Sequence, residues 1–134
     1  FYFYSKIGVM GQRNDNDKVS DLGWWLKPEK IYNVIKMVYE RYKLPIIITE
    51  NGLADSMDKY RKWWIEESVK AIHQATEEGC DVFGYLHWSL LDNFEWDKGY
   101  WPKFGLVSVD PNTKERKIKE SGKFYSKIID NNGL

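Results

Sequence analysis

The sequence is poor in the residue types that build disulfide frameworks and metal sites. Its 134 residues include one cysteine, Cys80, and two histidines, His73 and His87. A single cysteine excludes an internal disulfide framework and favours a reducing compartment, so we expect a cytoplasmic protein with Cys80 as a core thiol at the start of a strand. Neither histidine has another Cys or His at ligand spacing, and we therefore expect no metal and no cofactor.

Excess charge and long apolar runs are also missing. Twenty Lys and Arg residues balance twenty Asp and Glu residues, which gives no electrostatic basis for binding nucleic acid or an anionic membrane. No stretch approaches the roughly 20 apolar residues of a membrane span, and the N-terminus lacks the residue order of a signal peptide. We therefore expect a soluble chain with an uncharged partner.

The chain is short and does not begin with methionine. A length of 134 residues suits one domain of ordinary size, but it is below the roughly 250 residues of a closed eight-stranded barrel. The first residues, Phe1-Tyr2-Phe3-Tyr4, resemble a strand entered midway. Together these features suggest a fragment or one chain of a split protein.

Apolar runs alternate with amphipathic segments along the chain. The first predicted strand ends near residue 5. Three further strands are predicted over residues 45–50, 82–88 and 106–109. Three helices are predicted: one that follows Pro28, one over residues 59–78 and one around residues 121–129. Strands and helices that alternate in this way indicate an α/β fold with a parallel sheet.

The most informative strand is the one that ends in Glu50. Residues 45–48 are apolar without alternation, which predicts a strand buried on both faces. Glu50 follows at the C-terminal edge, before the turn dipeptide Asn51-Gly52, and α/β folds place their chemistry at this edge. From this segment alone, a structural role in which Glu50 caps the turn or pairs with a lysine remains the alternative.

Aromatic residues are abundant, with seven Trp, nine Tyr and six Phe. Flat rings in such numbers are typical of sugar-binding platforms and of interface anchors. Two tryptophans and two acids follow the 82–88 strand, namely Trp88, Asp92, Glu95 and Trp96. These residues form either a sugar site or ordinary core and surface. Glu50 and Glu95 can also be interpreted as an acid and nucleophile pair, and the spacing does not decide between these alternatives.

Three motifs resemble glycoside hydrolase family 1. They are Ile47-Ile48-Thr49-Glu50-Asn51-Gly52, then Gly84-Tyr85-Leu86-His87-Trp88-Ser89-Leu90-Leu91-Asp92-Asn93-Phe94-Glu95-Trp96, then Phe104-Gly105-Leu106. The second motif looks most like the archaeal β-glycosidases, and the resemblance extends from about Tyr4 to Ile129. It implies that residues 1–134 are the C-terminal segment of a single (β/α)₈ barrel domain, with the end of strand six, strands seven and eight, and their helices.

The resemblance implies a retaining β-glycosidase that hydrolyses β-linked glucosides or galactosides through a covalent glycosyl-enzyme. Glu50 matches the nucleophile of the family, and Tyr4 matches the tyrosine that orients it. The general acid/base of the family is the Glu of an Asn-Glu-Pro motif, which does not occur in this sequence. General acid and base catalysis each contribute about 10²–10⁴-fold, so we expect the isolated chain to be inactive.

The resemblance also implies a set of sugar contacts. Trp88 would form the platform under the sugar ring, Trp96 would donate its indole N–H to a hydroxyl, and Phe104 would line the pocket. Glu95 would hold sugar hydroxyls, and this role replaces its interpretation as half of an acid and nucleophile pair. The chain departs from the family at Lys103, where Arg is frequent.

An open quarter of a barrel raises the question of a partner. Its outer strands would expose unpaired edges, and its inner face would meet water. We therefore expect the chain to pair with the N-terminal remainder of the barrel or, less readily, with a second copy of itself. The alternative function is a non-catalytic sugar-binding or assembly module derived from the same fold.

Overall fold

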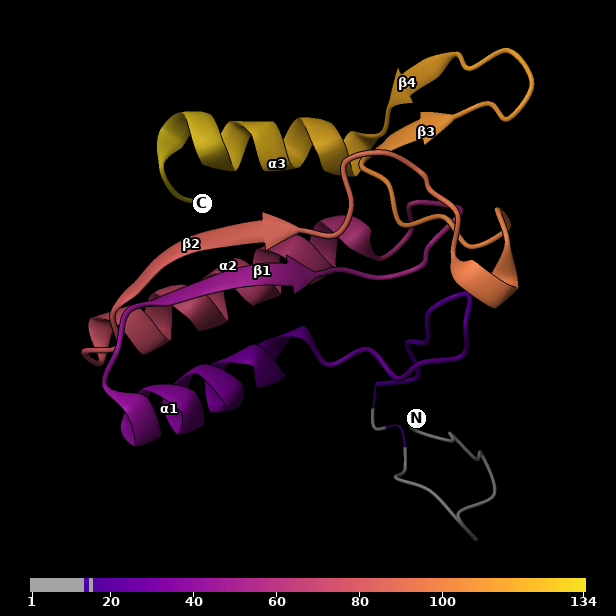
Figure 1. Ribbon diagram of the computed structural model, residues 1–134. Helices are drawn as coiled ribbons and strands as arrows, with labels where there is room; N and C mark the ends of the chain where they lie inside the picture. The colour runs from indigo at the N-terminus through magenta and orange to yellow at the C-terminus, as the bar shows by residue number, and fades with distance from the viewer. Residues whose placement is uncertain (1–13, 15) are drawn as a thin grey trace, which may run out of the picture.

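A computed structural model describes residues 14 and 16–134, which form strands and helices in alternation followed by a small hairpin (Figure 1). In chain order the elements are η1 Pro28–Lys30, α1 Ile31–Tyr42, β1 Ile46–Asn51, α2 Arg61–Glu77, β2 Val82–His87, η2 Trp96–Lys98, β3 Val107–Val109, β4 Arg116–Ile118 and α3 Glu120–Asn131. The strand predicted near residue 5 lies outside the described residues. The other predicted strands and helices are confirmed within a few residues.

The helices begin and end where local chemistry favours it. Pro28 opens the short 3₁₀ turn that leads into α1, because its fixed φ suits a first helical turn and its missing N–H has no partner there. Beyond the end of α2, Gly79 takes a φ of +90°, a left-handed conformation that glycine adopts without strain. Gly79 therefore ends this helix, close to residue 78, where the sequence predicted its end.

β1 and β2 pair in parallel, as the alternating pattern predicted. One face of this pair packs on α1 and α2 through a core of Ile35, Ala75 and Cys80. Partly buried aliphatic side chains from both strands join that core, among them Ile46 and Val82. Cys80 is 3% exposed and lies two residues before the start of β2, so the prediction of a core thiol is confirmed.

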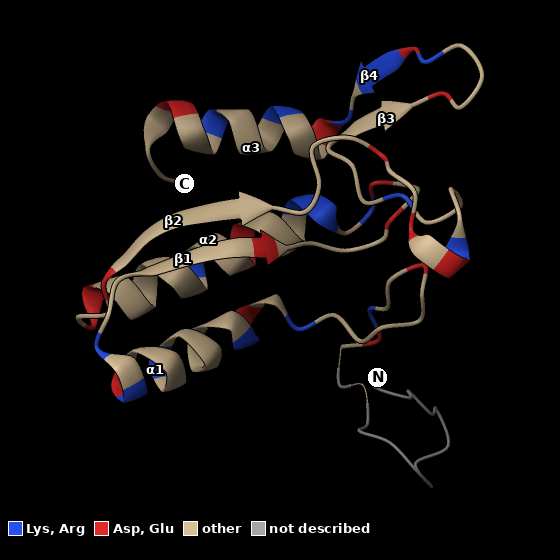
Figure 2. Ribbon diagram, in the orientation of Figure 1, with Lys and Arg blue, Asp and Glu red and all other residues tan. Residues whose placement is uncertain are grey.

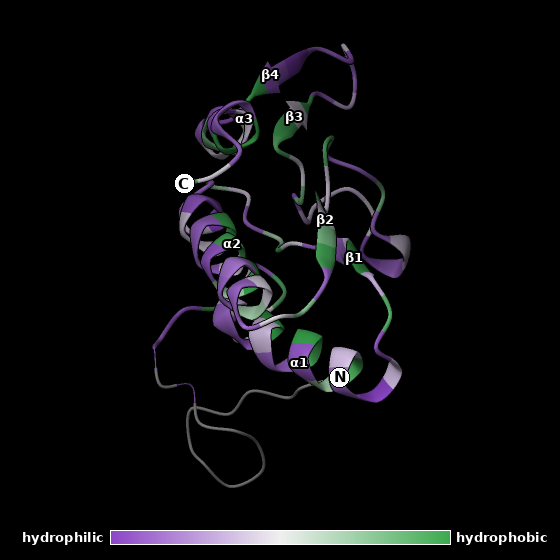
Figure 3. Cartoon of the chain, turned by 90° about the vertical axis from the view of Figure 1, so that its left-hand side faces the viewer, coloured by the Kyte–Doolittle hydropathy of each residue, from purple (hydrophilic) through white to green (hydrophobic). Residues whose placement is uncertain are grey.

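The opposite face of the strand pair is uncovered. Figure 3 shows α2 on the left of the two strands, and the side chains of Ile47, Phe83 and Leu86 are 43%, 65% and 53% exposed. The prediction of a strand buried on both faces is therefore wrong for this chain. The apolar residues are present on both faces of β1, but the described residues supply a helical layer for only one of them.

The C-terminal part adds a second core and a hairpin. Ile65 of α2, Leu106 and Ile128 of α3 pack together, so α3 is fixed against α2. β3 pairs antiparallel with β4, a strand that the sequence analysis missed because Arg116, Lys117 and Ile118 are all exposed and show no apolar alternation. Among the residues that the structure describes, no helix is long and apolar enough to cross a membrane.

Candidate functional site

Glu50 and Trp88 lie at the carboxyl edge of neighbouring parallel strands. Glu50 is exposed near the end of β1, and Asn51 pairs across the sheet with His87. The Trp88 amide donates a hydrogen bond of 2.9 Å to the Asn51 carbonyl, and the Trp88 side chain is 39% exposed. The strand register thus places the predicted nucleophile and the predicted sugar platform side by side.

Phe104 is brought to the same edge by a second piece of backbone. The Ser89 amide donates to the Phe104 carbonyl at 3.2 Å, and the Leu106 amide donates to the Ser89 carbonyl at 2.8 Å. The Phe104 side chain is only 4% exposed, and its ring centroid lies 6.4 Å from that of Trp24. In the described structure Phe104 therefore supports the edge from within.

Glu95 and Trp96 lie in the loop that follows β2, and Figure 1 shows η2 beyond the arrowheads of β1 and β2. The Glu95 amide donates to the Gly99 carbonyl at 2.7 Å, and the Lys98 amide donates to the Glu95 carbonyl at 2.8 Å. This tight turn leaves the Trp96 side chain 82% exposed. The Trp96 indole is thus an exposed flat apolar surface in the loop that follows the half-exposed Trp88. Tyr4 lies outside the described residues.

Gly52 explains why the strand can end so close to Trp88. A Cβ atom built on Gly52 would lie 1.8 Å from the Trp88 carbonyl oxygen, a separation that no side chain can reach without moving the backbone. Glycine is therefore required here for close approach of two backbone segments. The sequence analysis interpreted Gly52 only as part of a turn. Gly52 also allows the Trp88 backbone to pack against the end of β1 next to Glu50.

A partly buried polar cluster lies behind this edge. The Asn51 side-chain oxygen accepts hydrogen bonds from Trp64 Nε1 at 2.8 Å and from the Tyr85 hydroxyl at 3.0 Å. The Tyr85 oxygen lies 3.1 Å from His87 Nδ1, and the Tyr125 hydroxyl donates to the Tyr85 carbonyl at 3.1 Å. The sequence analysis missed this cluster, because Asn51-Gly52 was interpreted as a turn signal and no role was assigned to Tyr85, His87 or Tyr125.

Burial sets the protonation of the cluster. It raises the pKa of Tyr85, and together with the Arg61 charge it lowers the pKa of His87 to about 3. Both side chains are therefore uncharged at neutral pH. The Tyr85 and His87 rings, with their centroids 6.3 Å apart, form a neutral layer between the edge and α3.

Arg61 is the second group that the sequence analysis missed. Its side chain is 0% exposed, and one terminal nitrogen, Nη2, donates to the Asp55 carbonyl at 2.7 Å and to the Lys103 carbonyl at 2.6 Å. The other terminal nitrogen, Nη1, forms an ion pair with Asp58. Asp58 in turn accepts hydrogen bonds from the Ser121 amide at 2.9 Å and from the Ser121 hydroxyl at 2.6 Å. Arg61 thus joins the loop after β1, the loop before β3 and the start of α3.

The carboxylate of Asp58 makes the fold sensitive to acid. Partial burial raises its pKa, but the Ser121 hydrogen bonds and the Arg61 charge outweigh burial, so the pKa of Asp58 is lowered. A lowered pKa stabilises the folded state above the pKa of an unfolded Asp, about 3.9, and this stability is lost as the pH falls through the folded value. We expect the urea concentration at the unfolding midpoint to fall more steeply as the pH drops below about 4 in the parent protein than in Asp58→Asn. The same dependence of the midpoint on pH in both proteins would contradict this role of Asp58.

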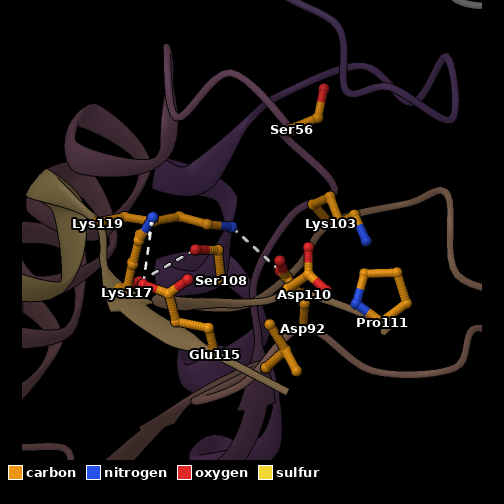
Figure 4. A pocket seen from close by; sticks show the side chains of 10 residues that line it. Ser56, Asp92, Lys103, Ser108, Asp110, Pro111, Glu115, Lys117 and Lys119 are labelled. Carbon is orange, nitrogen blue, oxygen red and sulfur yellow. Dashed lines mark hydrogen bonds and ion pairs between the residues drawn. The ribbon is translucent and has the colours of Figure 1, made fainter. Parts of the chain in front are cut away.

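Asp92 is buried in an ion pair, although composition alone left it as a possible surface residue. Its side chain is 5% exposed and lies 3.0 Å from Lys119 Nζ, and it also accepts a hydrogen bond from the Gly105 amide at 2.9 Å. Figure 4 shows this pair in the wall of an open cavity of about 420 Å³ beneath the β3–β4 hairpin. Glu50 and Trp88 do not line this cavity. Asp92 therefore anchors the loop that carries Glu95.

Charge is unevenly distributed over these elements. Figure 2 shows acidic and basic residues on the helices and basic residues on β4, whereas β2 carries no charged residue. Within residues 14 and 16–134, no three His, Cys, Asp or Glu side chains are grouped so that they could hold a metal ion. The chemistry available at the edge is thus that of one exposed carboxylate, the carboxylate of the following loop and exposed aromatic rings.

Comparison with known proteins gives a consistent result. Residues 4–134 match the family described as Glycosyl hydrolase family 1. The β-galactosidase of Saccharolobus solfataricus is 43% identical over an alignment of 138 residues that covers 98% of this chain and 28% of that protein. The solved β-glycosidase of Thermosphaera aggregans superposes with a TM-score of 0.85 at 44% identity, covering 87% of this chain and 24% of that one. The β-glucosidase of Thermotoga maritima, solved in complex with deoxynojirimycin, superposes with a TM-score of 0.84 at 39% identity, covering 87% and 29%.

The chain spans about a quarter of the length of these relatives. The structural relatives are (β/α)₈ barrels, so the described fold corresponds to a small part of such a barrel. This correspondence accounts for the uncovered face of the strand pair, because the strands of a barrel turn one face to the helices and the other to the interior.

Proposed function

Because the chain belongs to glycosyl hydrolase family 1, we propose that it supplies the nucleophile and part of the sugar-binding surface of a retaining β-glycosidase. The observation that carries this proposal is the position of Glu50, which is exposed at the carboxyl edge of β1 beside Trp88. Its carboxylate is free to meet a ligand on the uncovered face. We further propose that residues 1–134 form the part of one barrel domain that runs from the end of strand six through strand eight.

In this proposal Glu50 acts as an ionised carboxylate. It attacks the anomeric carbon as the aglycone departs, and a glycosyl ester forms that water then hydrolyses with net retention of configuration. A second carboxyl group, about 5–5.5 Å from the nucleophile in retaining enzymes, must protonate the leaving oxygen. That group comes from outside these residues, because the sequence contains no Asn-Glu-Pro. Tyr4 is proposed to orient Glu50.

The sugar is proposed to lie against the aromatic residues at the edge. Trp88 stacks on the apolar face of the ring, and the exposed Trp96 indole donates its N–H to a hydroxyl. Glu95 accepts hydrogen bonds from hydroxyls on the far side of the sugar, and Phe104 backs the pocket near C6. A carboxylate that holds O4 and O6 accepts either O4 configuration, so the proposed substrates are β-linked glucosides and galactosides.

The complete site is proposed to require the rest of the barrel. The exposed apolar residues on the uncovered face, such as Phe83 and Leu86, would be covered by the strands of the remaining segment. That segment is proposed to be the N-terminal remainder of the barrel rather than a second copy, because a copy would bring no acid/base. By the same reasoning, the 134 residues alone are expected to be inactive.

The test uses a chimera in which this chain replaces the matching segment of the Saccharolobus solfataricus β-galactosidase. A 2-deoxy-2-fluoro-β-glucoside with a good leaving group traps a carboxylate nucleophile as a stable ester. We expect intact-mass analysis to find one fluoroglucosyl group, and peptide mapping to place it on the peptide that contains Glu50. Glu50→Gln, as the matched control, should give no adduct. Sugar binding with no adduct, unchanged by Glu50→Gln, would instead favour a non-catalytic binding module.

A further inference from the structure

The direction in which Glu50 points depends on an irregularity in β1. Side chains of a regular strand alternate between its two faces. Ile46 and Ile48 pack on the helix-side core, whereas Ile47 is exposed on the opposite face. Continued alternation would turn Glu50 toward the helices with Ile46 and Ile48, but Glu50 is exposed like Thr49 before it.

The pairing with β2 shows where the alternation is broken. Ile48 is opposite Tyr85, and Asn51 is opposite His87. From one pair to the next, β1 advances by three residues and β2 by two, so β1 contains one extra residue at this point. An extra residue of this kind is a β-bulge, which re-aims the side chains next to it. The bulge thus accounts for the exposure of Glu50 at a position that regular alternation would turn toward the helices.

Asn51 fixes the far end of the bulge. Its side-chain oxygen accepts hydrogen bonds from Trp64 of α2 at 2.8 Å and from Tyr85 of β2 at 3.0 Å, with the Ser68 hydroxyl at 3.3 Å. Its carbonyl accepts the Trp88 amide at 2.9 Å. Asn51 is therefore attached on the helix side to α2 and across the sheet to β2, one residue beyond Glu50.

The order of donors in this cluster follows from the single proton of the Tyr85 hydroxyl. Because Tyr85 donates that proton to the Asn51 oxygen, its 3.1 Å contact with His87 must be a hydrogen bond donated by Nδ1–H of the imidazole. His87 is thereby fixed as the Nδ1–H tautomer, and its buried Nε2 has no hydrogen-bond partner among the described residues. The chain of donors runs from His87 through Tyr85 to Asn51.

We propose that Asn51 is a positioning residue whose side-chain oxygen, held by Tyr85 and Trp64, fixes the β-bulge that turns Glu50 toward the bound sugar. This inference rests on the proposed role of Glu50 as nucleophile. It assigns to Asn51, Tyr85 and Trp64 a function in the attack step rather than in sugar binding. A misplacement of about 1 Å can cost a reaction about 10²-fold even when the substituted residue is remote.

The experiment measures the rate constant of fluoroglucosyl trapping and the dissociation constant of the reagent separately in the chimera. Tyr85→Phe removes the hydroxyl that donates to Asn51, and we expect trapping to slow by about 10- to 100-fold with little change in the dissociation constant. The matched control is Tyr125→Phe, which removes the hydroxyl that donates to the Tyr85 backbone but not to Asn51. This control should trap at the parent rate.

Two variants of Asn51 itself separate positioning from general stability. Asn51→Asp keeps an acceptor oxygen and should retain most of the trapping rate, whereas Asn51→Leu removes the acceptor and should lose at least as much as Tyr85→Phe. If Tyr85→Phe fails to fold, Trp64→Phe removes the indole N–H donor together with part of the ring volume, and it should show the same slower trapping at an unchanged dissociation constant.

The inference would be overturned if folded Tyr85→Phe or Trp64→Phe were trapped at the same rate as the parent chimera. It would also be overturned if these variants had lower thermal unfolding midpoints but unchanged trapping rates. A failure of the proposed function is distinguishable, because it would leave the unsubstituted chimera without an adduct at Glu50.

Discussion

Replacing Glu50 by Gln in the chimera is expected to lower kcat/KM for an aryl β-glucoside by at least about 10⁴-fold, the scale on which hydrolases lose activity without their nucleophile. The amide has nearly the shape of the carboxylate but cannot form the glycosyl ester. Steady-state hydrolysis of the aryl glycoside measures the effect. Glu95→Gln, which alters a proposed sugar contact, should act mainly through KM, and Glu50→Gln that retains more than a tenth of the parent activity would contradict the assignment.

A small nucleophile provides a second readout of the same role. In Glu50→Gly the space left by the side chain is open on the uncovered face, where Glu50 is exposed. Azide can then attack the anomeric carbon from the side of the missing carboxylate, and one inversion gives an α-glycosyl azide. We expect added azide to increase the rate of aglycone release in Glu50→Gly. The rate of the parent chimera, which retains its own nucleophile, should not increase. A β-configured product would show that attack came from the other side.

The second large effect is expected at Arg61, and it concerns stability. Arg61→Met keeps much of the apolar stem but removes the guanidinium that binds the Asp55 and Lys103 carbonyls. It also leaves Asp58 without its cationic partner. Removing one member of a buried ion pair typically costs about 3–5 kcal/mol, and we expect a loss of this size in the free energy of unfolding of the chimera, measured by urea denaturation with tryptophan fluorescence.

A matched control for Arg61 is available on the same helix. Lys70 also forms ion pairs, with Glu66 and Glu67, but its side chain is 50% exposed. Exposed pairs on a helix contribute little, so Lys70→Met should leave the urea midpoint unchanged within error. Equal effects of Arg61→Met and Lys70→Met would show that burial does not determine the contribution of Arg61.

The order of the helices and strands could be predicted from the sequence because each element has a strong local signal. The apolar run of residues 45–48 predicted a strand over 45–50, the spacing of residues 59–78 predicted a helix, and both elements are confirmed. β4 could not be predicted in this way. Its three residues are exposed, and their conformation is set by pairing with β3 rather than by a pattern of their own.

The candidate site could be predicted less completely than the fold. Glu50 follows from its place at a strand end, but its orientation depends on a bulge that only the pairing of two strands reveals. Arg61 gives no sign of burial in the sequence, since a lysine-rich and arginine-rich helix start is usually solvated. The one local signal is Asp58, three residues before Arg61, whose carboxylate pairs with the guanidinium. The other contacts of the guanidinium are backbone carbonyls, those of Asp55 and Lys103, which any residue type supplies.

The strand pair with one covered and one uncovered face has a consequence for evolvability. Arg61, which is expected to contribute most to the free energy of unfolding, makes its contacts with the carbonyls of Asp55 and Lys103, whereas Trp88 is exposed at the carboxyl edge. Mutations on the exposed side can alter which sugar is accepted while the stabilising contacts persist. Selection for a new sugar specificity can therefore change the exposed side chains while the free energy of unfolding supplied by the other contacts is kept.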